Sequence, residues 1–313
     1  MNFDPKMTAF IFPGQGSQII GMGQALSTEF PTSQKLFEEA NDILGFPFSD
    51  IMWNGPEQSL NDTLNTQPAL FIHSMAVFRT FLTFSPNALP QYMAGHSLGQ
   101  LSAIAAAGAI NFKDGLRLVR KRGELMKQAG ASNPGGMAAI LGVDIPTLDR
   151  VCTEASTNDE IVQVANDNCA GQVVISGHKS ALERAMIGAK AAGAKRALPL
   201  AVSIAAHSPL MDTIQSQWTE AVIKSAIVDA GVTVIGNVTA LPMTDSASLR
   251  ADTIAQMQSR VRWTESIQWL ASQGVRTFIE IGSGTVLSSL VKRIVDGAIC
   301  LPLGKPEDFD AIK

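Results

Sequence analysis

The chain has 313 residues, 46% of them hydrophobic and 17% charged, which is enough apolar material for one large core or for a core with an inserted subdomain. A formal net charge of −4 carries no sign of a basic patch, so nucleic acid is not an expected partner. No apolar run approaches the ~20 residues that cross a bilayer and no signal peptide is supported, so we expect a cytoplasmic protein that does not bind membranes.

Strands and helices alternate in the first part of the chain. The expected elements, in order, are a strand at 8–12, helices at 30–43 and 68–82, a strand at 92–94, and helices at 101–110 and 112–127. Such alternation favours a parallel sheet flanked by helices.

The pattern changes after the segment 130–136, which is rich in Gly, Pro and Asn. The next expected elements are a strand at 137–141, a helix at 145–155, strands at 161–165 and 172–176, a helix at 180–192 and a strand at 196–199. The order βαββαβ is that of the ferredoxin-like unit, which is compact enough to form a subdomain.

The first pattern then resumes. It gives helices at 210–225, 264–272 and 286–294, with strands at 232–237 and 277–281. The sequence therefore predicts an α/β protein with a large domain, residues 1–130 and 201–313, and a small ferredoxin-like subdomain, residues 131–200, inserted into it.

Ser97 lies in a Gly-x-Ser-x-Gly segment, residues 95–99, between an expected strand and an alanine-rich helix. A sharp strand-to-helix turn would lift its hydroxyl above the sheet edge, as in an α/β-hydrolase-like domain, and the glycines would prevent crowding. The helix N-terminus would offer free N–H groups to a developing oxyanion. We predict that Ser97 is a nucleophile, although an ordinary strand-to-helix turn has the same pattern.

A serine is a weak nucleophile unless a base takes its proton, and neutral imidazole suits that role near pH 7. Of the four histidines, His73 is expected to be a hydrogen-bonded core residue and His178 to lie in a solvated loop. His96 adjoins the serine but should point to the opposite face. His207 is therefore the expected base, although a histidine before Ser-Pro also fits a helix start.

Arg122 shares the apolar stripe of the expected 112–127 helix, because apolar residues lie three or four positions from it on both sides. The two helices after Ser97 rise for ~13 residues and return for ~10, which leaves Arg122 level with the serine. An acyl group with a free carboxylate would satisfy both side chains. The alternatives for Arg122 are a pair with an internal carboxylate or a snorkelling stem.

The three cysteines, Cys152, Cys169 and Cys300, are widely separated and have neither metal-type spacing nor a disulfide framework. We expect them to be reduced, buried small residues.

Five motifs occur in one order along nearly the whole chain. They are FPGQGSQ at 12–18, GHSLG at 95–99, KRG at 121–123, GQVVISG at 171–177 and VRW at 261–263. Together they resemble the malonyl-CoA:acyl carrier protein transacylases. The resemblance implies that malonyl moves from coenzyme A to Ser97 and then to the pantetheine thiol of a carrier protein, in a two-step exchange for fatty acid or polyketide synthesis.

The resemblance also implies roles for individual residues. His207 would be the base and later the acid, and the backbone carbonyl of Gln256 would orient it in place of the acid of a triad. Arg122 would bind the malonyl carboxylate.

Other positions follow from the same resemblance. The backbone N–H groups of Gln15 and Leu98 would form the oxyanion hole, although Gln15 also fits a plain turn. Asn168 would line the cleft from the small domain, or cap a loop, and His96 would lie beside the cleft.

The resemblance calls for no metal and no redox cofactor, only thioesters of coenzyme A and phosphopantetheine as substrates. Malonyl-CoA and an acyl carrier protein are the expected partners of an enzyme that we expect to be a monomer. An acidic carrier protein would meet a basic surface near Lys190, Lys195 and Arg196, although these charges also fit a solvated face.

Two residues depart from the family pattern. Gln100 stands where glutamate is usual, and Arg260 stands where many members have proline. Three other functions stay open: a serine esterase or thioesterase, the malonyl-transferring subunit of malonate decarboxylase, and a carrier-binding scaffold without activity.

Overall fold

The computed structural model describes residues 4–202 and 204–311, and within them the strands form two sheets. The larger sheet has the strand order β10-β9-β1-β2-β7-β8. Its strands are β1 (Thr8–Phe12), β2 (Tyr92–Gly95), β7 (Thr233–Ile235), β8 (Pro242–Met243), β9 (Thr277–Ile281) and β10 (Ile299–Leu303). Neighbouring strands are parallel, as predicted, except that β8 pairs with β7 in the antiparallel sense.

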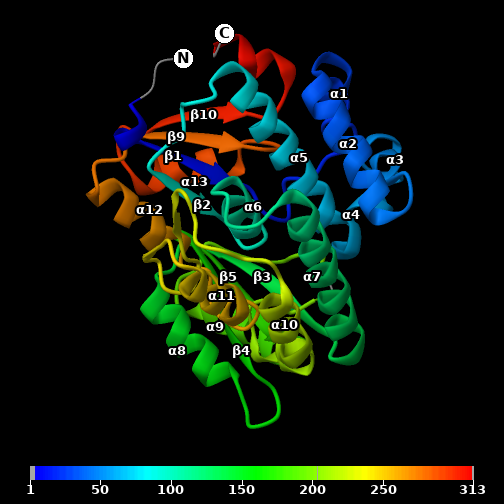
Figure 1. Ribbon diagram of the computed structural model, residues 1–313. Coiled ribbons are helices and arrows are strands. Elements are labelled where there is room, and N and C mark those ends of the chain that lie inside the picture. Colours follow the sequence, from blue (N-terminus) through cyan, green and yellow to red (C-terminus); the bar gives the residue numbers. More distant parts are fainter. Residues whose placement is uncertain (1–3, 203, 312–313) are drawn as a thin grey trace.

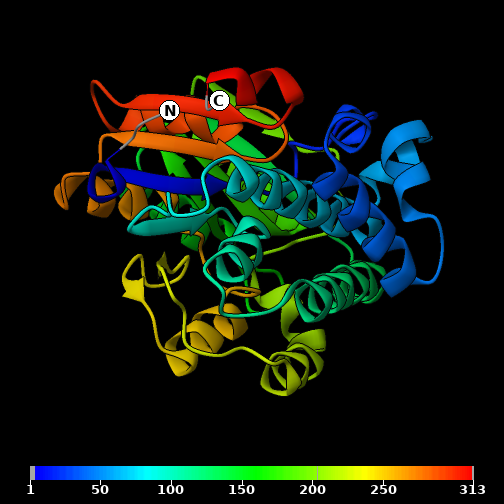
Figure 2. The same cartoon turned by 45° about the horizontal axis from the view of Figure 1, so that its top comes forward.

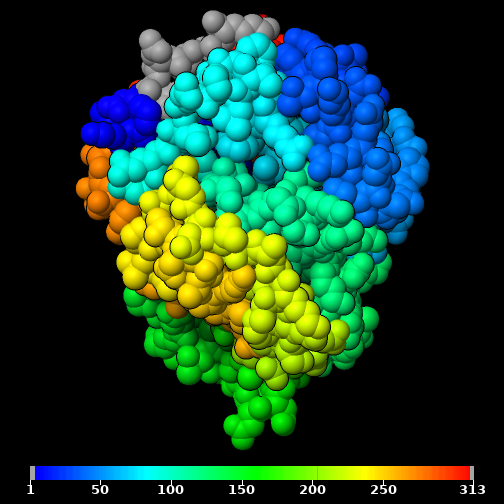
Figure 3. All heavy atoms as spheres, in the orientation of Figure 1, coloured from blue at the N-terminus to red at the C-terminus, as the bar shows by residue number. Residues whose placement is uncertain are grey.

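The smaller sheet is antiparallel and has the order β4-β5-β3-β6. Its strands are β3 (Gly135–Leu141), β4 (Val162–Cys169), β5 (Gln172–His178) and β6 (Arg196–Pro199), with α8 (Ile145–Ala155) after β3 and α9 (Lys179–Ala191) after β5. The expected order βαββαβ is therefore present. These elements gather at one end of the molecule, the green atoms at the bottom of Figure 3.

The larger sheet is the middle of three layers. Phe10 and Phe12 of β1 pack into one core with α5 (Thr63–Phe84), α6 (Gly99–Ala106) and α7 (Phe112–Ser132). Ala9 and Ile11 point the other way, into a core with α12 (Trp263–Ser272) and α13 (Val286–Ile294). Successive side chains of a strand alternate between faces, so a strand that is apolar throughout requires helices on both sides, as Figures 1 and 2 show.

The other helices pack around this framework. They are α1 (Gln24–Glu29), α2 (Pro31–Leu44), α3 (Phe48–Asn54), α4 (Glu57–Asn61), α10 (Asp212–Lys224) and α11 (Ser246–Ala255). No helix among the described residues combines the length and apolar character needed to cross a membrane.

The start of α5 corrects the expected boundary at Pro68. The helix begins at Thr63, where the Asp62 side chain accepts a hydrogen bond from the N–H of Leu64, and Pro68 lies inside it. Proline has no N–H to give to the carbonyl four residues earlier, that of Leu64. Arg120 of α7 donates to this carbonyl instead, at 3.1 Å, so the helix tolerates the proline.

Two further boundaries differ from expectation. The helix after Ser97 ends at Ala106 rather than at 110, because the chain turns at Gly108 with a φ of 78°. The next helix continues to Ser132, through part of the segment that we expected to break it.

His178 is not in a solvated loop, as we had expected. It is the last residue of β5, and its Nδ1 accepts a hydrogen bond from the N–H of Ile161.

Candidate functional site

Ser97 sits on a tight turn between β2 and α6, with a φ of 52°. A Cβ added to Gly95 would lie 1.9 Å from the oxygen of Gly99, and one added to Gly99 would lie 2.0 Å from the oxygen of Phe12. Both positions therefore require glycine, which explains the Gly-x-Ser-x-Gly segment as a steric necessity. Asn237 holds the turn, since its Oδ1 accepts from the N–H of Ser97 at 2.8 Å and its Nδ2 donates to the oxygen of Gly95 at 2.7 Å.

His207 lies beside the serine, although the two residues are far apart in the sequence. The Ser97 Oγ is 2.8 Å from His207 Nε2, and His207 Nδ1 is 2.8 Å from the backbone oxygen of Gln256. A carbonyl can only accept, so Nδ1 carries the proton and Nε2 is free to accept from the serine hydroxyl. Burial, with the positive charge of Arg122 as a second cause, lowers the pKa of His207 to about 3. The imidazole is therefore neutral at pH 7 and able to act as a base.

Arg122 reaches the same hydroxyl from α7. Its Nη2 donates to Ser97 Oγ at 3.1 Å and to Gln256 Oε1 at 2.8 Å, while its Nη1 donates to Gln67 Oε1 at 2.9 Å. The side chain is 2% exposed, and within residues 4–202 and 204–311 it forms no ion pair. Burial lowers its pKa to about 10, so the guanidinium stays charged near neutral pH. Its partners are amide and hydroxyl groups, which leave the charge available to an anion.

These side chains line a cavity of about 350 Å³. One wall comes from the turns that follow β1 and β2, including Gln15 and Leu98, and the other from the small sheet, including Met137, Ala139 and Val174. In the small sheet, alternate residues such as Ala138 and Ile140 point to its own core. The cavity thus lies between the two sheets.

Gln15 and Leu98 both line this cavity with Ser97. The backbone N–H of neither residue donates to a backbone acceptor in the part of the chain that the structure describes. Free N–H groups beside a nucleophile are what an oxyanion hole requires.

His96 and Asn168 also meet at the cavity. His96 Nε2 lies 2.8 Å from Asn168 Oδ1, and the imidazole packs edge-on against Trp263. Burial lowers the pKa of His96. We expected His96 to point to the opposite face from Ser97, but both residues line this cavity. The hydrogen-bond partner of the serine hydroxyl is His207, whereas that of His96 is Asn168.

The sequence is similar to those of known acyl transferases along nearly its whole length. The model of the acyl transferase domain family matches residues 9–303. The malonyl CoA-acyl carrier protein transacylase of Bacillus subtilis (strain 168) is 45% identical over 302 residues, which cover 96% of this chain and 95% of that protein. The protein of the same name from Salmonella typhimurium is 42% identical, with 97% of each chain covered. The chain belongs to the malonyl-CoA–acyl carrier protein transacylase family.

Solved structures of this transacylase family have the same fold. A crystal structure of an acyl carrier protein S-malonyltransferase from Vibrio cholerae has a TM-score of 0.94 and 39% identity, and covers 98% of this chain and 100% of its own. A malonyl-transacylase in complex with a type II polyketide synthase acyl-carrier protein also has a TM-score of 0.94, with 40% identity over 97% of this chain.

Four residues that support the transacylase site were not anticipated from the sequence. They are Gln67, Gln163, Asn237 and Asp252. Gln163 of β4, for example, donates from Nε2 to the backbone oxygens of His207 and Gln258 at 2.8 and 2.9 Å, and so ties the small sheet to the base. For the three amides, a glutamine or asparagine near apolar residues was the available signal, and it does not say which partner the amide meets. For Asp252 the sequence offered no signal.

Arg260 and Gln100, the two residues expected to depart from the transacylase pattern, lie in different parts of the structure. Arg260 pairs with Asp149 of α8 at 3.2 Å, on the side of the small sheet away from Ser97. Gln100 is fully buried directly behind the serine, where its Nε2 donates to Asp252 Oδ2 at 2.7 Å.

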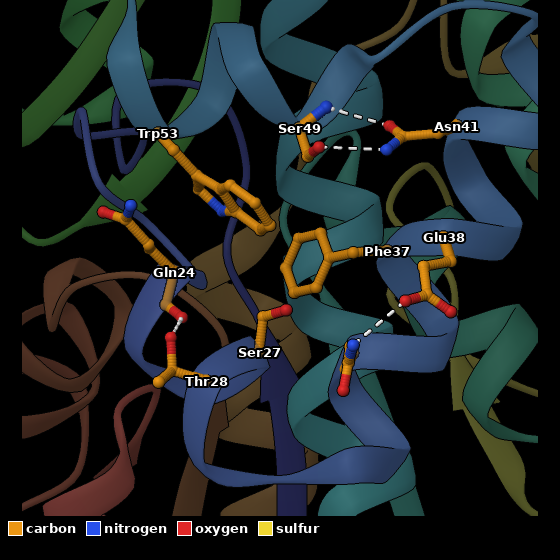
Figure 4. A pocket seen from close by; sticks show the side chains of 9 residues that line it. Gln24, Ser27, Thr28, Phe37, Glu38, Asn41, Ser49 and Trp53 are labelled. Carbon is orange, nitrogen blue, oxygen red and sulfur yellow. Dashed lines mark hydrogen bonds between the residues drawn. The ribbon is translucent and has the colours of Figure 1, made fainter.

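A second cavity, of about 490 Å³, lies among α1, α2 and α3. Figure 4 shows Asn41 bonded to the hydroxyl and to the N–H of Ser49, with Phe37 and Trp53 side by side. Its lining holds no histidine and no arginine, so it offers no counterpart to the serine, base and cation found beside β2.

Proposed function

We propose that this protein transfers a malonyl group from coenzyme A to the phosphopantetheine thiol of an acyl carrier protein, through a malonyl ester of Ser97. One observation carries the proposal: Ser97 Oγ lies within hydrogen-bond distance of both His207 Nε2, at 2.8 Å, and Arg122 Nη2, at 3.1 Å. A nucleophile, its base and a buried cation thus meet at one cavity. The names of the family members cited above support the same activity.

In the first half-reaction, His207 Nε2 takes the hydroxyl proton as Ser97 Oγ attacks the thioester carbonyl. The resulting oxyanion lies where the N–H groups of Gln15 and Leu98 have no other acceptor, and each such donor is typically worth about 3 kcal/mol of barrier. Collapse of this intermediate breaks the C–S bond, and the protonated imidazole gives its proton to the sulfur of coenzyme A.

The second half-reaction reverses these steps with a new thiol. His207 accepts the proton of the carrier's pantetheine thiol, the sulfur attacks the malonyl ester, and Ser97 Oγ leaves with the proton. Throughout, Arg122 holds the malonyl carboxylate, and this contact selects acyl groups that carry a second acid. An arginine-bound acyl group in a desolvated cavity also hinders attack by water.

The two sheets would correspond to two domains. Residues 1–130 and 201–313 would form a large α/β-hydrolase-like domain, and residues 131–200 a ferredoxin-like subdomain. The strand order β6-β3-β5-β4 and the element order βαββαβ support the second assignment. Phosphopantetheine would enter between them, along the apolar wall that includes Met137 and Val174.

We also propose which cofactors and partners the enzyme uses and where in the cell it works. The reaction needs no metal or redox cofactor, and we propose a cytoplasmic monomer that binds neither nucleic acid nor membrane. Three exposed basic residues would attract an acidic carrier protein: Lys190 on α9, Lys195 in the turn after it and Arg196 at the start of β6. The carrier would serve fatty acid synthesis.

A second acceptor is supported by one finding. The structural neighbour solved with a type II polyketide synthase carrier makes a polyketide carrier an alternative acceptor. The malonyl-transferring subunit of malonate decarboxylase would differ from both only in its acceptor. The esterase alternative is less well supported, because hydrolysis of a simple ester requires no buried arginine.

Mass spectrometry of the intact protein tests this function. After brief exposure to malonyl-CoA, a malonyl adduct should be retained on the peptide with Ser97, and carrier protein in its phosphopantetheine form should discharge it. Acetyl-CoA serves as the control, with less adduct expected. Rapid release of free malonate without any carrier would instead support a hydrolase.

A further inference from the structure

Gln100 lies inside a buried chain of hydrogen-bonded side chains behind the site. Its Nε2 donates to Asp252 Oδ2 at 2.7 Å, and its Oε1 accepts from the Nε2 of Gln256. The Oε1 of Gln256 in turn accepts from Arg122 Nη2 at 2.8 Å. Asp252, Gln100, Gln256 and Arg122 thus form one hydrogen-bonded chain that runs from α11 through α6 to α7.

The two ends of this chain fix its direction. A carboxylate such as Asp252 only accepts and a guanidinium such as Arg122 only donates. Gln100 must therefore present its NH₂ to Asp252, which leaves its oxygen for Gln256. Gln256 must then present its own NH₂ to Gln100, which leaves its oxygen for Arg122.

The opposite orientation of the Gln256 amide would be costly. Its Nε2 also lies 3.1 Å from the backbone oxygen of Ser97 and 3.2 Å from Asn237 Oδ1. A reversed amide would place its oxygen against these acceptors and its NH₂ against the guanidinium. In a buried site, such unmatched polar groups cost more than the hydrogen bonds they replace.

Asp252 is well suited to anchor the chain. It is 4% exposed, and its carboxylate accepts from the backbone N–H groups of Asn237, Val238 and Thr239 at 2.9 to 3.1 Å. These N–H groups hold the acceptor in place, so it does not turn away from Gln100.

We propose that Gln100 is a positioning residue, which through Gln256 keeps a carbonyl oxygen facing Arg122 and an N–H group facing the backbone of Ser97. This role rests on the proposed malonyl transfer, because the guanidinium that it aligns is the malonyl-binding group. A carboxylate at position 100 would meet the carboxylate of Asp252, whereas an amide completes the chain.

The test uses two substitutions at position 100. Gln100→Met keeps the size of the side chain but removes both of its polar contacts, so Gln256 is no longer held. We expect malonyl loading of Ser97 to slow at least tenfold and acetyl loading to slow much less, because acetyl makes no use of Arg122. A malonyl-to-acetyl ratio equal to that of the wild type would overturn the proposal.

The Gln100→Glu variant tests the direction of the hydrogen-bonded chain through the pH dependence of malonyl loading. The ionisable side chains that face this network are Arg122 on α7, Asp252 on α11, and His207 and His96 beside Ser97. Two carboxyl groups in contact do not readily ionise together, so this pair should retain one proton towards neutral pH. With that proton, the carboxyl group can donate to Asp252 and loading should match the wild type. As pH rises and the proton leaves, two facing carboxylates repel each other, which should displace the side chain at position 100 from Gln256. Malonyl loading should then fall at least tenfold.

A double variant provides the matched control. Gln100→Glu combined with Asp252→Asn leaves a single carboxylate in the pair. Malonyl loading should then no longer fall as pH rises, even if the rate of loading is below that of the wild type. A Gln100→Glu profile that overlays the wild type between pH 5 and 9 would contradict the proposal, as would a fall that persists in the double variant.

Recovery of malonyl loading by the Gln100→Glu variant on return to low pH excludes misfolding as the cause. Failure of the wild type to load malonyl would instead refute the proposed function itself.

Discussion

The six-stranded and four-stranded sheets meet at one cavity but contribute different things to it. The large sheet and its helices supply Ser97, Arg122 and the free N–H groups, all close to the carboxyl ends of β1 and β2. The small sheet supplies a wall of apolar side chains and Asn168. Parallel strands bring several loops to one edge, where reacting groups can converge, whereas an antiparallel sheet presents a broad face. Substitutions on either side of the cavity would test this division.

Removal of the base should have the largest effect. His207→Ala leaves the Ser97 hydroxyl without an acceptor for its proton, and we expect malonyl loading to slow about 10⁴-fold, as for other serine nucleophiles without their histidine. Quench-flow with intact-mass detection would measure the rate. Loading within tenfold of the wild type would show that His207 is not the base.

Loss of the buried cation should affect one substrate more than another. Arg122→Ala should lower kcat/KM for malonyl-CoA about 100-fold, because the acyl carboxylate loses its charged partner, and lower acetyl loading far less. Arg122→Lys is the control, since it keeps the charge without the fork of donors. Equal losses with both thioesters would count against carboxylate binding.

Three histidines whose pKa values are lowered by burial, His73, His96 and His207, should make stability depend on pH. Burial lowers the pKa of His73 to about 4, and that of His207 is lowered to about 3. Between these values and about 6.5, the unfolded chain binds more protons than the folded one, so the free energy of unfolding should fall as pH falls. The slope is at most about 1.4 kcal/mol per pH unit for each group.

Urea unfolding of the wild type and of His73→Gln at pH 7 and pH 5 would measure this dependence. Glutamine can replace the hydrogen bond from His73 Nε2 to the oxygen of Gly304 but does not titrate. Its curve should therefore change less between the two pH values. An identical change in both proteins would show that His73 is not the source.

The smallest effect should come from the small sheet. Asn168→Ala removes the amide that meets His96 and changes no reacting group, so we expect malonyl loading to slow only by about two- to fivefold. Steady-state loading at saturating malonyl-CoA would measure it. A loss as large as that of His207→Ala would remove the distinction between the sheet that reacts and the sheet that forms a wall.

The bounds of helices and strands were predictable where the apolar pattern was clear. β1, β9, α8 and α13 have the predicted bounds, since their apolar patterns and flanking turn residues agree. Helix α11 and strand β10 were missed. The first has a mixed surface with few apolar positions, and the second is a short edge strand whose Pro302 argues against a strand.

The sequence by itself determined the steric and chemical identity of the site. Gly95 and Gly99 permit the turn at Ser97, and the type and spacing of His207 and Arg122 marked them as partners. The tertiary structure alone decided the hydrogen bonds behind them: which amide faces Asp252, and which backbone oxygen fixes the tautomer of His207. An amide both donates and accepts, so its role depends on its neighbours in space, whereas a glycine's steric freedom and an arginine's charge belong to the residue itself.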